Sequence, residues 1–153
     1  MRKSILILLC VCGLFFTGCK GTGTKSTTAA SGPPKSDVDF AKDTLQLMAD
    51  GSDDAADRID WENFKTMGLD VGEQYKKTDD ESARDNFRKS FIRGFSNSFK
   101  SSGGNLSTAA KWREESKDAN STVVAVDSPN GKTLLLTVTH TDGQQKISAM
   151  NAK

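Results

Sequence analysis

The sequence predicts an α+β domain in which N-terminal helices, one of them long, pack on one face of a four-stranded antiparallel meander sheet. Apolar residues recur at helical spacing between Val38 and Phe99. After Asn105 the apolar period changes to two, which is typical of strands. The dipeptides Asn130-Gly131 and Asp142-Gly143 are strong signals for hairpin turns between such strands.

The first 19 residues have the pattern of a secretory signal. Arg2 and Lys3 precede an apolar run, 5–16, that is shorter than the roughly 20 residues of a membrane-spanning helix. The run ends in Thr17-Gly18-Cys19, which resembles the lipobox of bacterial lipoproteins, although Phe16 stands where leucine is usual. The resemblance implies cleavage between Gly18 and Cys19 and acylation of Cys19. The alternatives are an ordinary signal peptide with an unrelated cysteine, or a buried apolar terminus.

A lipoprotein of this kind has three parts: a signal peptide, 1–18, a lipidated cysteine with its tether, 19–35, and a single α+β domain, 36–153. The tether is rich in Gly, Ser, Thr and Pro and has no large apolar residue, so we expect it to be disordered. The expected location is the bacterial cell envelope, with the anchor at Cys19 in a membrane. Lys20 stands where aspartate favours the inner membrane, so the outer membrane is favoured in a diderm host.

Charge and cysteine content exclude several classes of function. Two of the 21 basic residues lie in the signal, and the chain has 20 acidic residues, so the chain after the signal is nearly neutral. A nearly neutral chain is not expected to bind nucleic acid. Cys10 and Cys12 lie in the signal, so no thiol is left for a disulfide, a redox pair or zinc. The acidic runs 53–57 and 79–81 lack the spacing of a calcium loop. Neither a metal nor a cofactor is expected.

The first predicted helix begins at Ser36, where Asp39 completes a capping box, and ends at Gly51. Two short helical stretches are predicted next, 53–60 and 60–67, and the segment 69–77 is ambiguous. Trp61 is interpreted as a core residue rather than a ligand-stacking one. The longest helix is predicted from Glu81 to Lys100, with Thr78 as its capping residue.

This long helix has a phenylalanine at every fourth position: Phe87, Phe91, Phe95 and Phe99. The stripe drifts around the helix by about 40° per step, so a twisted sheet is a suitable partner. Its side chains are core in the simpler interpretation and line an apolar ligand cavity in the other. Gly94 inside the helix indicates a bend or a close backbone approach.

Four strands are predicted: 106–116, 121–127, 132–141 and 144–150. An even loop at Asn130-Gly131 would give one buried face, made of Ala110, Trp112, Val123, Ala125, Leu134, Leu136, Val138, Ile147 and Ala149. In this register Leu136 pairs with Ala149 and Trp112 with Ala125, and an odd loop would break it. The other face would then hold a possible interface of Val124, Val126, Leu135 and Met150, rimmed by basic residues, for a homodimer or an envelope protein partner.

Two segments carry a resemblance to a known superfamily. Residues 40–56, with Leu47-Met48-Ala49-Asp50-Gly51, resemble the opening helix and turn of nuclear transport factor 2-like (cystatin-like) domains. Residues 137–147 resemble the closing hairpin of small lipoproteins of that superfamily, with Gln145 where tryptophan is common. The resemblance implies a cone-like domain with a pocket between the long helix and the curved sheet. The superfamily includes both enzymes and binding modules.

The pocket expected in such a cone would be lined by Phe87, Phe91, Phe95, Trp112, Leu136, Val138 and His140. His140 is the only histidine and shares a face with Leu136 and Val138, so it is a candidate general base. A catalytic histidine needs an orienting carboxylate, and only Asp142 stands near it in the sequence. A half-exposed histidine at a strand end is the simpler interpretation.

The sequence therefore predicts a lipid-anchored envelope protein whose domain is a non-enzymatic binding module for a small apolar ligand or a protein partner. No catalytic residue is predicted. The alternatives are a pocket enzyme of the nuclear transport factor 2-like type with His140 as base, and a structural envelope accessory factor.

Overall fold

The computed structural model describes residues 35–106, 111–129 and 131–153. The predicted signal, the lipidation site Cys19, the tether up to residue 34 and Ala110 lie outside these residues. The part from Gly32 to Lys153 forms one compact unit. The core lies within this unit, from Ala41 to Met150, so we expect it to fold on its own.

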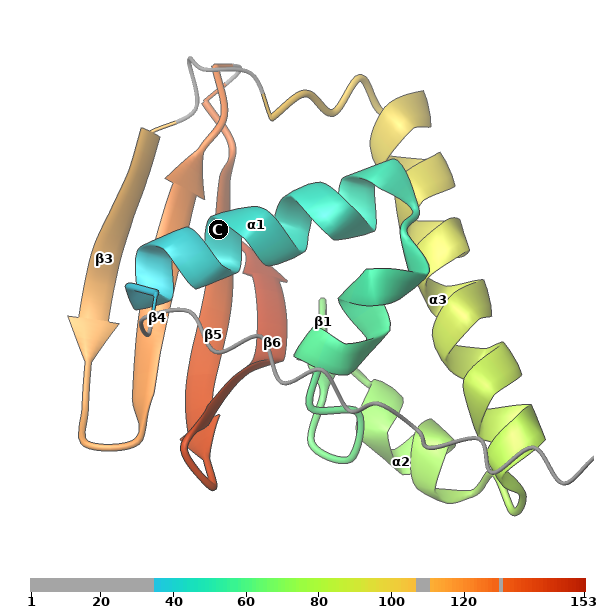
Figure 1. Cartoon of the computed structure of the whole chain (residues 1–153). Coiled ribbons are helices and arrows are strands. Elements are labelled where there is room, and N and C mark those ends of the chain that lie inside the picture. Colours follow the sequence, from blue (N-terminus) through green and yellow to red (C-terminus); the bar gives the residue numbers. More distant parts are fainter. Residues whose placement is uncertain (1–34, 107–110, 130) are drawn as a thin grey trace, which may run out of the picture. The chain divides into compact units, whose positions relative to one another are not determined.

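Figure 1 shows helices beside and across a sheet, so the α+β prediction is confirmed. The elements are α1 (Asp37–Asp50), the 3₁₀ helix η1 (Asp53–Arg58), β1 (Lys65–Thr66), β2 (Leu69–Asp70), α2 (Val71–Lys76), α3 (Glu81–Ser101), β3 (Lys111–Lys117), β4 (Ser121–Asp127), β5 (Thr133–Thr141) and β6 (Gln144–Ala152).

The sheet has six strands in the order β2-β1-β6-β5-β4-β3, rather than the predicted four. Strands β3 to β6 form the predicted antiparallel meander. The two additional strands form a short hairpin whose β1 pairs in parallel with β6. The helix predicted over 60–67 is therefore wrong, because the free edge of β6 supplies hydrogen-bond partners that a short isolated helix lacks.

The turn of this hairpin is made by Met67 and Gly68, both with positive φ, 46° and 80°. Two positive values are characteristic of a type I′ turn, in which Asn or Gly is usual at the first position. The Met67 amide donates to the Met150 carbonyl at 3.1 Å, which holds the turn against β6. A bulky apolar side chain thus occupies a position that turn geometry alone would not select.

The ends of α1 are as predicted. The Ser36 hydroxyl accepts a hydrogen bond from the Asp39 amide at 3.1 Å, and Gly51 ends the helix with φ 78°. The predicted cap of the long helix is wrong. Asp80, not Thr78, caps α3 by accepting from the Ala83 amide at 2.7 Å. A carboxylate next to the first helical residue interacts more strongly with the helix dipole than a hydroxyl two residues earlier.

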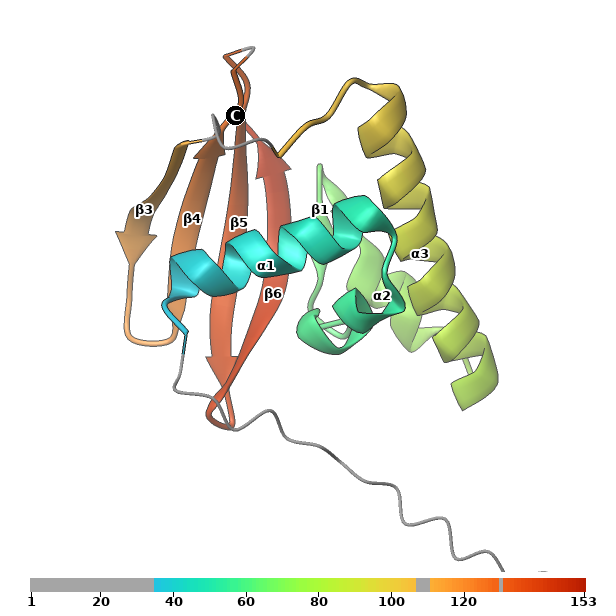
Figure 2. The ribbon, with the colours of Figure 1, turned by 45° about the horizontal axis from the view of Figure 1, so that its top comes forward.

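Helix α1 crosses the inner face of the sheet, and α3 packs against α1 and η1 beside it (Figure 2). The stripe on α3 therefore meets aromatic residues before it meets the sheet, since Phe91 lies 5.6 Å from Trp61 and 5.5 Å from Phe64 between ring centroids. Gly94 makes no close approach, because a Cβ built there has no neighbour within 4 Å. Of the two alternatives predicted for Gly94, a bend or a close backbone approach, the close approach is therefore wrong.

The predicted register fails at three places. Asp127 pairs with Thr133, so the connection between β4 and β5 is odd in length, and β4 presents its other side to the core. A bulge between Thr137 and Val138 then pairs Leu136 with Met150 instead of Ala149. A second bulge, between Glu114 and Ser116, pairs Trp112 with Val126.

The consequence is that most of the predicted interface belongs to the core. Val124, Val126 and Met150 are buried against α1, whereas Leu135 remains on the outward face with Val123, Ala125 and Ala149. The predicted interface of four residues is therefore wrong in three of them. Leu136, Val138 and Ile147 are fully buried on the inner face, as predicted.

Candidate functional site

A polar cluster lies where α1 begins, around the buried side chain of Asp37. This residue is only 8% exposed although it is the first residue of the helix. Its Oδ2 accepts a hydrogen bond from the Thr122 hydroxyl at 2.7 Å. Its Oδ1 accepts from Gln145 Nε2 at 2.7 Å and lies 2.9 Å from His140 Nε2. Lys117 Nζ lies 3.8 Å from Oδ2.

These partners come from four strands in sheet order, so one carboxylate joins α1 to β3, β4, β5 and β6. Burial raises the pKa of the Asp37 carboxyl, but the hydrogen bonds from Thr122, Gln145 and His140 together outweigh it. The pKa of Asp37 therefore lies below its ordinary value of 3.8. The group is a carboxylate at neutral pH that accepts hydrogen bonds from Thr122, Gln145 and His140, while Lys117 is an ion-pair partner at 3.8 Å.

His140 has the orienting carboxylate that the sequence did not reveal. Asp37, 103 positions earlier, takes that role rather than Asp142. The imidazole is 43% exposed and lies on the same strand face as Val138. Sequence reasoning missed Asp37 and Thr122, because helix-start aspartates and strand threonines are common. The available signal was Gln145, a polar residue in the last strand, which makes one of the hydrogen bonds.

An apolar cavity of about 210 Å³ lies at the other end of α1. Leu45, Phe95, Phe99, Val126 and Leu134 bring together α1, α3, β4 and β5 around it. The remaining lining comes from Met67, Ser102, Gly104, Asn105, Leu106, Ser128, Lys132, Thr133 and Ala152. It therefore has an apolar interior and a polar margin, as small-molecule sites commonly do.

Only Phe95 among the predicted pocket residues lines this cavity. Leu136 and Val138 are fully buried beneath α1, and Trp112 packs against the same core. His140 stands at the far end of β5 from Thr133, about 23 Å away at strand spacing. The predicted pocket thus divides into a core region, a polar end and a cavity end.

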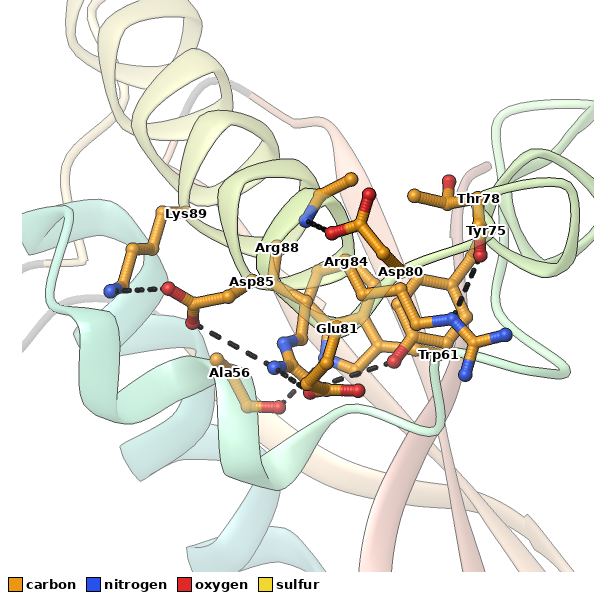
Figure 3. A network of polar contacts seen from close by, with 11 residues as sticks. Ala56, Trp61, Tyr75, Thr78, Asp80, Glu81, Arg84, Asp85, Arg88 and Lys89 are labelled. Atoms are coloured by element: carbon orange, nitrogen blue, oxygen red, sulfur yellow. Dashed lines mark hydrogen bonds and ion pairs between the residues drawn. The ribbon is translucent and has the colours of Figure 1, made fainter.

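Phe87 and Phe91 belong to an aromatic cluster around Trp61. Ring centroids of Phe87 and Trp61 are 6.2 Å apart, and Trp61 and Tyr75 are 6.0 Å apart. Figure 3 shows the indole of Trp61 donating to the Ala56 carbonyl, at 2.7 Å, beneath a polar network on α3. Trp61 is therefore a satisfied core residue, as the sequence indicates.

The network in Figure 3 joins α2 to the start of α3. Arg88 donates to the Tyr75 hydroxyl at 3.2 Å and to Glu81 at 2.8 Å. Arg84 donates to the Thr78 carbonyl at 3.0 Å and lies over the Tyr75 ring, 5.5 Å from its centroid. These contacts fix α2 against the start of α3 beside the aromatic cluster, so we assign them a structural role.

No group of three or more His, Cys, Asp and Glu side chains is placed to hold a metal ion in residues 35–106, 111–129 and 131–153. Within the same residues, no helix has the length and apolar character needed to cross a membrane.

Comparison with known proteins gives one structural likeness. No protein-family model matches the chain, and no curated protein matches its sequence. A solved structure, an NTF-2-like protein of unknown function from Silicibacter pomeroyi DSS-3, is similar with a TM-score of 0.42 and 16% sequence identity. The likeness covers 75% of this chain and 89% of that chain.

Proposed function

We propose that the chain is a lipid-anchored protein of the bacterial cell envelope whose nuclear transport factor 2-like domain binds a small apolar ligand without catalysing a reaction. The anchor is Cys19, the connection is the tether 19–35, and the outer membrane is the favoured location in a diderm host. The observation that carries the binding function is the 210 Å³ cavity between α1, α3 and the sheet.

The size and lining of the cavity support a ligand rather than a packing defect. An engineered apolar cavity of about 150 Å³ is large enough to bind benzene. This cavity is larger, and apolar side chains from four elements surround it. The space is open to solvent on one side, so a ligand could enter it without the domain unfolding.

Binding of naphthalene to residues 32–153 tests this function. Leu134 lines the cavity, and its neighbour Leu135 lies on the outward face. We expect Leu134→Trp to weaken binding at least about tenfold, equivalent to about 1.4 kcal/mol, because the indole fills the cavity. Leu135→Trp is the matched control and should leave the affinity unchanged. An apolar probe that does not bind the unaltered domain, or that binds Leu134→Trp equally well, would refute the proposal.

Membrane attachment is tested separately. Cys19→Ala should move the protein from the membrane pellet to the soluble fraction of fractionated cells, because the acyl chains supply the anchor. A variant that pellets as wild type does would show that Cys19 is not the anchor.

A second candidate function is an enzyme with His140 as general base, and the 2.9 Å contact between His140 and Asp37 favours it. The alternative requires a substrate at the polar end of α1, far from the apolar cavity. A cellular phenotype that is lost in His140→Ala, with the fold intact, would favour the enzyme over the binding module.

The outward face of the sheet is a proposed contact surface for a second copy of the chain. Leu135, Val123 and Ala149 are partly exposed there, with Arg113 at their edge. Sedimentation of residues 32–153 tests it: a dimer that Leu135→Asp converts to monomer supports the contact. A monomer at high micromolar concentration, unaffected by the substitution, would exclude it.

A further inference from the structure

A second apolar space adjoins the cavity. A groove of about 450 Å³ runs along α3, lined by Thr66, Met67, Phe91, Gly94, Phe95, Ser98, Phe99 and Ser102. Four of these residues, Met67, Phe95, Phe99 and Ser102, line the cavity as well. The rings of Phe95 and Phe99 stack with centroids 5.8 Å apart and border both spaces. The four shared residues place the cavity and the groove side by side, and the two together are called the path below.

The shape of this path selects for an elongated ligand. At about 210 Å³ the cavity is below the roughly 300–1,000 Å³ of pockets that enclose a drug-sized molecule, so it holds only part of a longer one. The residues of α3 that line the two spaces run from Phe91 to Ser102, a length of about 16 Å at the rise of a helix. An extended aliphatic chain at roughly 1.3 Å per carbon, from C–C bonds of about 1.5 Å, matches this length with a dodecyl group.

Gly94 keeps the groove open. A Cβ built at this position has no neighbour within 4 Å, so nothing in the fold requires glycine there. Glycine nevertheless weakens a helix interior relative to alanine. The open surface over Gly94 is continuous with the exposed edges of Phe91 and Phe95, and a side chain at this position would occupy the groove.

Met67 is the second observation that points to a ligand. It is 64% exposed and stands at the first central position of a type I′ turn, where its φ of 46° is unfavourable for a methionine. Its flexible thioether borders both the cavity and the groove, and methionine adapts well to apolar ligands. An asparagine would suit the turn better, so the apolar side chain is explained by the path beneath it.

The margin of the cavity is suited to a carboxylate head group. Asn105 and Ser128 contribute an amide and a hydroxyl there, and both groups can donate hydrogen bonds to a carboxylate. The carboxylate of Asp127, next in sequence to this margin, is paired with Arg113 and accepts from the Thr133 hydroxyl at 2.7 Å. Its charge is thus compensated, so it opposes an anion at the margin less than an unpaired carboxylate would.

We propose that the cavity and the α3 groove together bind the unbranched chain of a medium-length fatty acid, with its carboxylate at the cavity margin and Met67 lying over the chain. This inference rests on the proposed function and specifies its ligand. A compact ring system would fill the cavity alone, whereas a linear chain occupies both spaces.

Calorimetric titration of residues 32–153 with dodecanoate, hexanoate and naphthalene, each below its aggregating concentration, tests the inference. We expect dodecanoate to bind at least about thirtyfold more tightly than hexanoate, because its additional methylenes lie in the groove. Gly94→Leu should abolish this preference and leave the affinity for hexanoate unchanged, since the new side chain blocks the groove and not the cavity.

Met67→Asn should lower the affinity for dodecanoate about tenfold, because the apolar side chain over the ligand is lost. The thermal unfolding midpoint should stay the same or rise, because asparagine suits the turn. Leu69→Asn is the matched control: Leu69 is 60% exposed on the same hairpin but lines neither space, so binding should not change. Naphthalene binding without a preference for dodecanoate would overturn the fatty-acid inference and leave the proposed function standing. Absence of binding by all three probes would overturn both.

Discussion

The two ends of α1 are built on different principles. At its beginning, the carboxylate of Asp37 is surrounded by donors from four strands, and its hydrogen bonds are short and directional. Eight residues later, Leu45 faces a cavity whose lining is held by apolar contacts. Directional bonds fix position and tolerate little change, whereas apolar contacts tolerate changes in volume. The helix is thus fixed at its beginning by directional bonds to the sheet, whereas Leu45, farther along it, borders space for a ligand.

The largest expected effect comes from removing the carboxylate. Asp37→Ala should lower the free energy of unfolding by about 3 kcal/mol, because the buried Thr122 hydroxyl loses its acceptor and α1 loses its connection to the sheet. Urea denaturation of residues 32–153 measures it. Asp43→Ala, at a half-exposed position of the same helix where the carboxylate pairs with Lys35 at the surface, is the control and should change stability by less than about 1 kcal/mol. Equal effects at the two positions would remove the distinction between the ends.

A pair of valines sharpens the comparison in packing. Val124 is fully buried, while Val126, two residues along the same strand face, lines the cavity. Val124→Ile should destabilise the domain by about 1–2 kcal/mol, since there is no room for a further methylene. Val126→Ile should stabilise it by about 0.5 kcal/mol by filling unoccupied volume. Thermal unfolding of both variants decides this, and a loss at both positions would mean that the cavity end is packed as tightly as the rest.

The free energy of unfolding should fall at acid pH because of Asp37. The pKa of Asp37 is lower in the folded chain than its ordinary 3.8, so its contribution is fully present above about pH 4. The contribution is lost as the pH falls from there through the lower, folded pKa. Wild type should therefore lose more stability between pH 5 and pH 2, roughly, than Asp37→Asn, which cannot titrate there. Parallel curves for the two proteins would contradict the assigned shift.

The smallest effect is expected at His140. His140→Ala should cost less than about 1 kcal/mol, because the imidazole is 43% exposed and Asp37 retains its hydrogen bonds from Thr122 and Gln145. Chemical denaturation beside Asp37→Ala gives the comparison. A loss as large as that of Asp37→Ala would mean that the histidine, not the carboxylate, organises this end.

Local sequence signals predicted the elements whose causes are local. The Ser36 cap, the Gly51 stop and the Asp142-Gly143 hairpin each depend on residues within a few positions, and all three are present. The β1-β2 hairpin was not predictable in this way, because its strands exist through pairing with β6, about 80 residues further along the chain. The helical interpretation of 60–67 considered only neighbours in sequence.

Register and site were missed for a related reason. One odd connection and two bulges decide which side of each strand faces α1, and none of the three leaves a reliable mark in the sequence. The Asp37 cluster joins residues 85 and 108 positions apart, so no motif could contain it. The cavity likewise depends on where α3 lies, and the apolar stripe predicted an apolar partner without identifying it.

The cluster at Asp37 also has a mechanical meaning. Gln145 donates to the Lys35 carbonyl at 2.9 Å as well as to Asp37, so the last residues before the domain are fastened at the point where the chain enters it. A pull applied at Lys35 is shared among bonds to β4, β5 and β6 instead of opening one contact after another. Load applied at Lys35 would therefore enter the sheet through three strands at once, at the first residues of the domain.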